Sequence, residues 1–207
     1  MLDLNQILSY ALALGIAAAI PGPGITALVA RSVANGPGAA FAMLGGLMLG
    51  DLVYLSFAVF GLALIASSFS TLFVAIRWFS ILYLLWLAWS FWTAEQHQLT
   101  TSAPSRKDLF SASFSGLTIT LGNPKTIAFY LALLPLVLDL DTVGFTTWAT
   151  VLVPVTILVL LLVGGVFILA AVGVRKALSS PKAQTRLHRG AAVAMASAAG
   201  TMVAREF

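Results

Sequence analysis

The chain has no cysteine, which excludes disulfides, iron–sulfur clusters and thiolate metal sites. Charged residues are also scarce: they make up 9% of its 207 residues, against about 25% in soluble domains. Hydrophobic residues make up 60%, and the mean hydropathy is +1.00. Composition therefore excludes a water-soluble globular fold and predicts an integral membrane protein.

Histidine is the other residue type in short supply. His97 and His188 both lie in polar stretches, where solvated loop positions are expected. We therefore predict no metal site and no cofactor. The net charge is +4, and the basic residues cluster in short loops between apolar runs. This distribution is a signal of membrane topology and does not indicate nucleic-acid binding.

Long apolar runs fill most of the chain. A helix needs roughly 20 mainly apolar residues to cross about 30 Å of hydrocarbon. The first run follows no positively charged region and no evident cleavage site, so we expect a retained helix and not a signal peptide. The sequence predicts an all-α membrane helix bundle of about six spans: about residues 4–29, 38–66, 71–92, 109–137, 145–174 and 190–204.

Two polar linkers, residues 95–108 and 175–189, interrupt the apolar runs. We expect a single transmembrane domain, residues 1–207, with halves of about 1–93 and 109–207 joined by a polar loop 94–108. Three spans per half is an odd number, so any structural repeat must be inverted across the membrane, as in many secondary transporters.

Basic residues predict the orientation. Cytoplasmic loops carry an excess of lysine and arginine, so the basic side should be cytoplasmic and both termini external. With six spans, that side receives Arg31, Arg106, Lys107, Arg175, Lys176, Lys182, Arg186 and Arg189.

The element Pro21-Gly22-Pro23-Gly24 lies inside the first apolar run. Each proline lacks an N–H and clashes with the carbonyl four residues earlier, so the helix must break or kink. Broken backbone is tolerated at membrane depth only inside protein or along a wet cavity. One interpretation is a kink that only aids packing. Two prolines and two glycines favour the other, a discontinuous helix whose second half points its positive end at an anionic group.

A comparable element, Gly122-Asn123-Pro124-Lys125, lies inside the fourth run. A lysine near mid-helix costs about 2.5–3.5 kcal/mol, so it normally faces the bundle interior or water. Pro124 is predicted to free the Thr120 carbonyl, and Asn123 adds an amide that donates and accepts. The alternative is that Lys125 snorkels to an interface, which the long uncharged stretches on both sides disfavour.

Asp51 is an isolated acidic residue in the second run. A lone carboxylate in low dielectric is strongly disfavoured, so it should be protonated or paired. Its candidate partners are Lys125, Arg31 and the broken backbone of residues 21–24. A structural ion pair is one interpretation. We favour a proton-coupling or ammonium-binding role, because ionisable groups inside membranes are functional candidates by default.

Small residues recur every four positions in two segments. Such a face lets another helix approach closely. We expect packing within the bundle, and a homodimer is the alternative that the sequence leaves open. The two faces are Ala42, Gly46 and Gly50, and Ala192, Ala196, Gly200 and Ala204.

Over roughly residues 5–175 the chain resembles the LysE/RhtB-type family of bacterial amino-acid exporters, the lysine exporter superfamily. The resemblance implies a small exporter of amino acids or related metabolites, located in the bacterial inner membrane and driven by the proton gradient. It rests on Pro21–Gly24, Arg31-Ser32, Gly36, Gly46, Gly50, Asp51, the run Tyr83-Leu84-Leu85-Trp86-Leu87, Asn123-Pro124-Lys125, Pro135 and Asp139.

The predicted site lies near mid-membrane between the two broken helices. Lys125 and the amides around Gly22 and Gly24 would hold a substrate carboxylate. Asp51, Asn123 and freed carbonyls would hold its ammonium, and protonation of Asp51 from outside would promote release. The full predicted substrate-binding set is Pro21, Gly22, Pro23, Gly24, Asn123, Pro124 and Lys125, with Asp51 for proton coupling.

Other functions remain as alternatives. A channel or a transporter for another solute is the nearest, although the lack of cysteine and of intramembrane histidine disfavours a metal cation. A purely structural membrane subunit would leave the buried lysine and aspartate without a purpose. An intramembrane enzyme is disfavoured, because the sequence has no His-Glu-x-x-His or Gly-x-Ser-x-Gly element and only one mid-span aspartate.

Overall fold

The computed structural model describes residues 2–60, 104–174 and 181–204, together with residues 78, 82, 85, 86, 88, 89, 92 and 93. Within these residues all regular secondary structure is helical, so the predicted all-α class is confirmed. The third predicted span, residues 71–92, lies mostly outside the described residues. Residues 94–103 of the predicted polar loop lie outside them as well.

The first predicted span is broken where its prolines lie. α1 (Leu4–Ala19) ends just before Pro21, and α2 (Pro23–Val59) begins two residues beyond that proline. Pro23 occupies the first turn of α2, where a missing N–H costs nothing because that N–H would have no helical acceptor. The predicted helix break is therefore confirmed.

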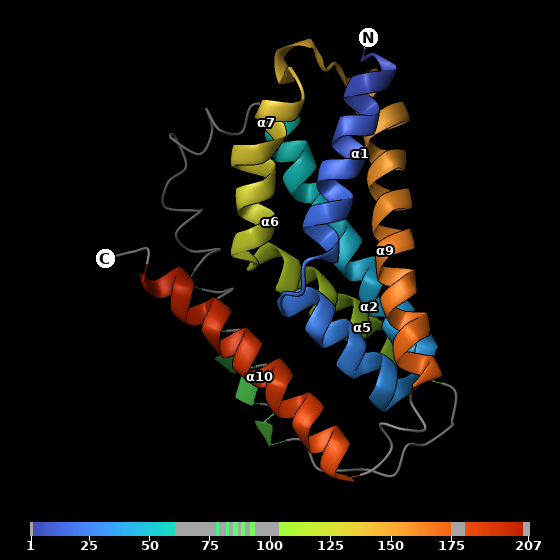
Figure 1. The fold of residues 1–207 in the computed structure, drawn as a ribbon, viewed down its shortest axis with the longest axis vertical. Coiled ribbons are helices and arrows are strands. Elements are labelled where there is room, and N and C mark those ends of the chain that lie inside the picture. Colours follow the sequence, from blue (N-terminus) through green and yellow to red (C-terminus); the bar gives the residue numbers. More distant parts are fainter. Residues whose placement is uncertain are drawn as a thin grey trace.

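α2 reverses its direction at Gly36, which has φ 79° and ψ −178° and is followed by Pro37. That positive φ is open to glycine because glycine has no Cβ. A Cβ built on Gly24 would lie 3.2 Å from the Leu47 side chain, although a straight helix would separate these residues by about 35 Å. Figure 1 shows the two arms of α2, coloured blue and cyan, meeting at the lower end of the bundle.

The fourth predicted span is also broken. Its two parts, Arg106–Leu121 and Pro124–Val137, meet at an angle of 52°. The first part is α5 (Arg106–Leu121), and the second comprises α6 (Pro124–Ala128), the π-helix η1 (Phe129–Leu133) and α7 (Leu134–Val137). π-Helical turns are rare and occur frequently at functional sites.

The fifth predicted span is a long apolar helix. Residues Phe145–Gly173 have a mean hydropathy of 3.0 over the window that defines a span. The short 3-10 helix η2 (Leu140–Thr142) precedes this stretch, which comprises α8 (Phe145–Thr147), the π-helix η3 (Trp148–Leu152) and α9 (Val153–Gly173).

α10 (Pro181–Ala204) corrects two expectations at the C-terminal end. It begins inside the predicted linker 175–189, so that linker is wrong from residue 181 onward. Its buried face is formed by Ala192, Met195 and Ala199, which pack into the core. Ala196 and Gly200 of the predicted small-residue face are exposed. The face that packs is therefore rotated from the predicted one and includes the larger Met195.

The small-residue face of α2 packs against α5, as predicted. A Cβ built on Gly46 would lie 1.8 Å from the backbone oxygen of Ser113, and one on Gly50 would lie 2.6 Å from Thr120. The hydroxyl of Ser113 donates a hydrogen bond of 2.8 Å to the Ala42 carbonyl. Only residues without side chains at these points allow the two backbones to approach so closely.

Several helix ends that carry basic residues lie at the same end of the bundle. Figure 1 shows the bend of α2, the end of α9 and the start of α10 at one end of the bundle, with the N-terminus at the opposite end. The start of α5 is held beside the bend, since a Cβ built on Gly38 would lie 3.2 Å from the Pro104 ring. Described basic residues predicted to face the cytoplasm, such as Arg31, Arg106 and Lys182, therefore lie toward one end.

The described residues form an apolar helix bundle whose span count stays a prediction. Two described helices, Pro23–Val59 and Phe145–Gly173, are long and apolar enough to cross a membrane, and the bent pair Arg106–Leu121 and Pro124–Val137 makes a third. α1 is apolar but has only 16 residues. The inverted arrangement of two halves likewise stays a prediction.

Candidate functional site

At the first helix break, backbone N–H donors and backbone carbonyl acceptors lie outside regular helical hydrogen bonding. The backbone of Ile20 is extended (ψ 121°), and Gly22 is extended as the N-cap of α2 without a side-chain cap. Both the N–H and the hydroxyl of Thr26 donate to the Gly22 carbonyl, at 2.9 and 2.8 Å. The amides of Gly24 and Ile25 fall in the first turn, where a helix offers no acceptor.

At the second helix break, the backbone hydrogen-bonding groups find other partners. The side-chain oxygen of Asn123 accepts the N–H of Lys125 at 3.0 Å and so caps α6. The predicted freeing of the Thr120 carbonyl is wrong, because the N–H of Asn123 donates to it at 3.0 Å. The carbonyl of Leu121, which would receive the Lys125 N–H in a continuous helix, accepts the hydroxyl of Tyr54 instead.

Lys125 connects the two breaks. Its Nζ donates a hydrogen bond of 2.7 Å to the carbonyl of Ile20, which is 105 positions away in the sequence. A Cβ built on Gly22 would lie 3.5 Å from the same Nζ, so the ammonium lies directly against the broken backbone of the first span. The cation therefore lies at the first break and not at an end of the bundle.

A pocket of about 70 Å³ opens beside these breaks, lined from α1, α2, α5, α6, η1 and α9. It brings together four residues of the predicted site, namely Gly24, Asp51, Asn123 and Lys125. The remaining predicted residues, Pro21, Gly22, Pro23 and Pro124, are not in its lining and lie in the two helix breaks beside it.

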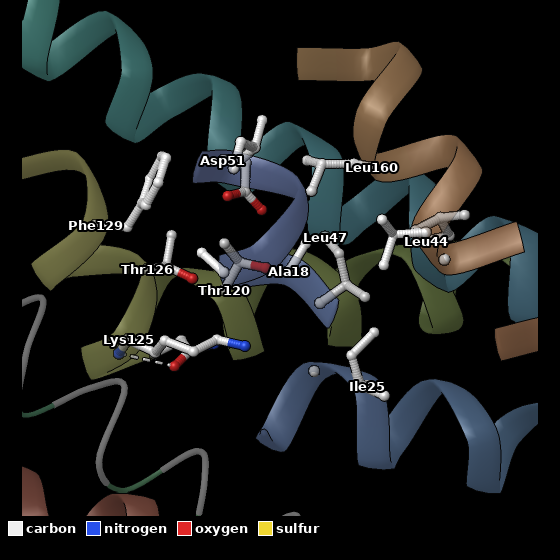
Figure 2. A pocket seen from close by; sticks show the side chains of 16 residues that line it. Ala18, Ile25, Leu44, Leu47, Asp51, Thr120, Lys125, Thr126, Phe129 and Leu160 are labelled. Atoms are coloured by element: carbon white, nitrogen blue, oxygen red, sulfur yellow. Dashed lines mark hydrogen bonds between the residues drawn. The ribbon is translucent and has the colours of Figure 1, made fainter. Parts of the chain in front are cut away.

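Asp51 and Lys125 enter this pocket from different helices. Figure 2 shows the carboxylate of Asp51 on one side and the ammonium of Lys125 on another, with Thr120 and Ala18 between them in this view. Within the described part of the chain no ion pair joins the two, although each is an electrostatic neighbour of the other. The arrangement therefore places a carboxylate and an ammonium apart from each other in one small pocket.

Most of the remaining lining is aliphatic or aromatic. Two threonines, Thr120 and Thr126, add hydroxyls next to the Asn123 cap, and sequence inspection did not single them out as site residues. Across residues 2–60, 104–174 and 181–204, no three His, Asp or Glu side chains come together as a metal site would require. The apolar lining comprises Leu14, Leu44, Leu47, Phe129, Leu160 and Val163 among others.

Three of the four tyrosines surround Asp51, and the sequence analysis did not identify them. Tyr10 and Tyr130 are fully buried and Tyr54 is 5% exposed. All three interact electrostatically with the Asp51 carboxylate. The missed signal is that a tyrosine inside an apolar run needs a partner for its hydroxyl when it is buried.

Comparison with known proteins establishes the family. The profile of the LysE type translocators matches residues 15–205, which is nearly the whole chain. The chain belongs to this family. The resemblance found in the sequence is thereby confirmed.

Relatives of this LysE type translocator include membrane proteins and efflux proteins. An uncharacterized membrane protein of Synechocystis sp. is 31% identical over 168 residues, covering 81% of the chain and 79% of that protein. A leucine efflux protein of Salmonella choleraesuis is 28% identical over 167 residues, covering 77% and 79%. A leucine efflux protein of Klebsiella pneumoniae is 28% identical over 126 residues, covering 59% and 58%. No solved structure matches the chain.

Family membership fixes the broad class of the protein. A LysE type translocator with these apolar helices is an integral membrane protein, and its place is the bacterial inner membrane. Its family transports solutes, and its relatives include efflux proteins.

Proposed function

We propose that this LysE type translocator exports neutral amino acids with aliphatic side chains, in exchange for protons. The observation that carries the proposal is the position of the Lys125 ammonium against the Ile20 carbonyl at the first helix break, beside an otherwise mostly apolar pocket that Asp51 enters from another helix. Relatives that are named leucine efflux proteins support the same substrate class.

The substrate carboxylate is assigned to the two breaks. Lys125 supplies a cation, and the first-turn amides of Gly24 and Ile25 supply donors at the positive end of α2. Asn123 uses its oxygen to cap α6, so its NH2 group remains as a donor, which suits a carboxylate. Pro21, Pro23 and Pro124 contribute indirectly by keeping the backbone out of helical hydrogen bonding.

The substrate ammonium is assigned to Asp51. This carboxylate lies in the pocket without an ion pair to Lys125 among the described residues, so it is available to a cationic group. When Asp51 takes up a proton from outside, the ammonium loses its counter-charge and release is favoured. Loss of that proton to the cytoplasm restores the carboxylate for the next substrate, which couples export to proton entry.

The substrate side chain is assigned to the aliphatic lining, with Leu14, Leu47 and Leu160 as examples. A charged substrate side chain, in addition to the carboxylate and the ammonium, would find no partner in this lining. The pocket of about 70 Å³ has room for roughly five water molecules, whereas ligand pockets usually measure about 300–1,000 Å³. The pocket is thus smaller than a usual ligand site, and alternating access would widen it when an amino acid binds.

The test is efflux from proteoliposomes loaded with radiolabelled amino acids. An antiporter works in either orientation, so mixed insertion does not obscure the result. We expect leucine, valine and isoleucine to leave at least about tenfold faster than lysine or glutamate, and an acidic exterior to accelerate that efflux. Equal rates for leucine and lysine would contradict the substrate class. Leucine efflux that ignores the pH gradient would favour a channel.

Asp51→Asn is expected to slow leucine efflux at least tenfold and to abolish its response to external pH. The amide keeps the shape of the side chain but supplies neither the charge for the ammonium nor a titrating group. Rates at external pH 6 and pH 8 measure both effects. Asp3→Asn is the matched control, because asparagine also caps a helix well. Normal transport and pH response in Asp51→Asn would refute the role of Asp51.

A further inference from the structure

The hydroxyl of Tyr130 is buried and makes no hydrogen bond of ordinary geometry among the described residues. Tyr130 lies in the π-helix η1 and its side chain has no exposed surface. Its ring stacks on Tyr54 at 6.4 Å and packs edge-on against Phe129 at 5.0 Å, so the ring is held firmly. Buried polar groups are nearly always paired, and an exception inside a rigid aromatic cluster calls for a functional explanation.

Two polar side chains flank this hydroxyl. The carboxylate of Asp51 on α2 and the hydroxyl of Tyr10 on α1 both lie close enough to Tyr130 to exchange a hydrogen bond with it. A tyrosine hydroxyl has one proton to donate and lone pairs to accept with. The Tyr130 hydroxyl is thus able to donate to only one of its two neighbours at a time.

The hydroxyl of Tyr10 is already oriented by α9. Tyr10 and Thr156 share a buried hydrogen bond of 2.6 Å. The single proton of the Thr156 hydroxyl is used in a bond of 2.7 Å to the Leu152 carbonyl. Tyr10 must therefore be the donor to Thr156, which leaves lone pairs on the Tyr10 oxygen to accept a proton from Tyr130.

We propose that Tyr130 is a positioning residue that transmits the protonation state of Asp51 to the α1–α9 pair. With Asp51 ionised, Tyr130 donates to the carboxylate and makes no bond to α1. With Asp51 protonated, the carboxylic acid donates to Tyr130, and Tyr130 donates to Tyr10. A continuous chain of hydrogen bonds then joins α2, η1, α1 and α9 in the protonated state alone.

This inference rests on the proposed role of Asp51 and adds the route from proton uptake to helix movement. The titratable groups that face Asp51 come from several elements. Lys125 is the only cation that acts on it within the described residues. From α5 and α9 the polar groups in this region are Thr120 and Thr156, which do not titrate. The remaining groups are Tyr130 from η1, Tyr10 from α1 and Tyr54 from α2 itself.

Tyr130→Phe tests the proposal, because it removes the hydroxyl and keeps the packed ring. Two rates are measured in proteoliposomes: exchange of leucine at equal pH on both sides, and leucine efflux with an acidic exterior. We expect exchange within about threefold of the unmodified protein, while the acceleration by external acid falls at least fivefold. Tyr10→Phe is expected to give the same pattern and carries the test if Tyr130→Phe is not recovered as folded protein.

Ser32→Ala is the matched control, since it removes another fully buried hydroxyl, one that bonds within its own helix to the Leu28 carbonyl. An unchanged pH profile in Tyr130→Phe would overturn the inference. Equal loss of exchange and of acid stimulation would overturn it too, because that result indicates a structural or substrate-binding role. If the unmodified protein neither exchanges leucine nor responds to acid, the proposed function itself fails, and this inference falls with it.

Discussion

Lys125→Ala is expected to slow leucine export roughly 10- to 150-fold. The change removes the ammonium that lies against the Ile20 carbonyl at the first helix break. Hydrogen bonds to charged groups contribute about 1.5–3 kcal/mol, and each 1.4 kcal/mol is a factor of ten. The loss should appear mainly as a raised half-saturating concentration of leucine, because the carboxylate would lose its cation in the bound state. Efflux from proteoliposomes over a range of internal leucine concentrations measures both parameters.

Lys107→Ala is the matched control for this variant. Lys107 is an exposed lysine in the first turn of α5, far along the chain from either break. Its removal should leave efflux within about twofold of the unmodified protein. If Lys125→Ala is monodisperse and exports leucine with normal affinity, the assignment of the carboxylate to Lys125 is wrong. The ammonium would then serve only to hold the two breaks together.

Gly46→Ala is expected to destabilise the folded protein strongly. The added methyl group would lie 1.8 Å from the backbone oxygen of Ser113 and 2.9 Å from the amide nitrogen of Leu117. Backbone atoms of a packed helix cannot turn aside, so α5 must move away from α2. Overpacking costs about 1–3 kcal/mol in ordinary cores, and a clash with backbone should reach the upper end. We expect an apparent melting temperature at least about 5 °C lower in detergent.

Gly45→Ala provides a control on the same turn of the same helix. A Cβ at Gly45 meets nothing within 4 Å among the described residues, and alanine is the better helix former. Its melting temperature should equal or exceed that of the unmodified protein. Gly116→Ala should behave like Gly46→Ala, because its Cβ would lie 2.1 Å from the Met43 carbonyl oxygen. Equal stability of Gly46→Ala and Gly45→Ala would contradict the close contact between α2 and α5.

Local chemistry explains which parts of the site were predicted. Pro21 and Pro124 break their helices wherever these fold, because a proline has no N–H to donate. The charges of Asp51 and Lys125 are conspicuous in apolar runs because burying them is costly. The hydrogen-bond partners of the backbone groups at the breaks were not predictable in the same way. The Thr120 carbonyl is satisfied by the backbone N–H of Asn123, three residues later, a detail of local geometry that the sequence pattern does not specify.

The sequence by itself determined the membrane class, the helix breaks and the charged residues, since each follows from composition or from a single residue's covalent chemistry. The tertiary structure decided which of these features meet. The contact of Lys125 with Ile20 and the capping of Leu121 by Tyr54 join residues far apart in the chain. Such contacts depend on how far each helix is rotated and how closely its neighbour approaches. Those quantities are set by the packing of all side chains together, and no single motif encodes them.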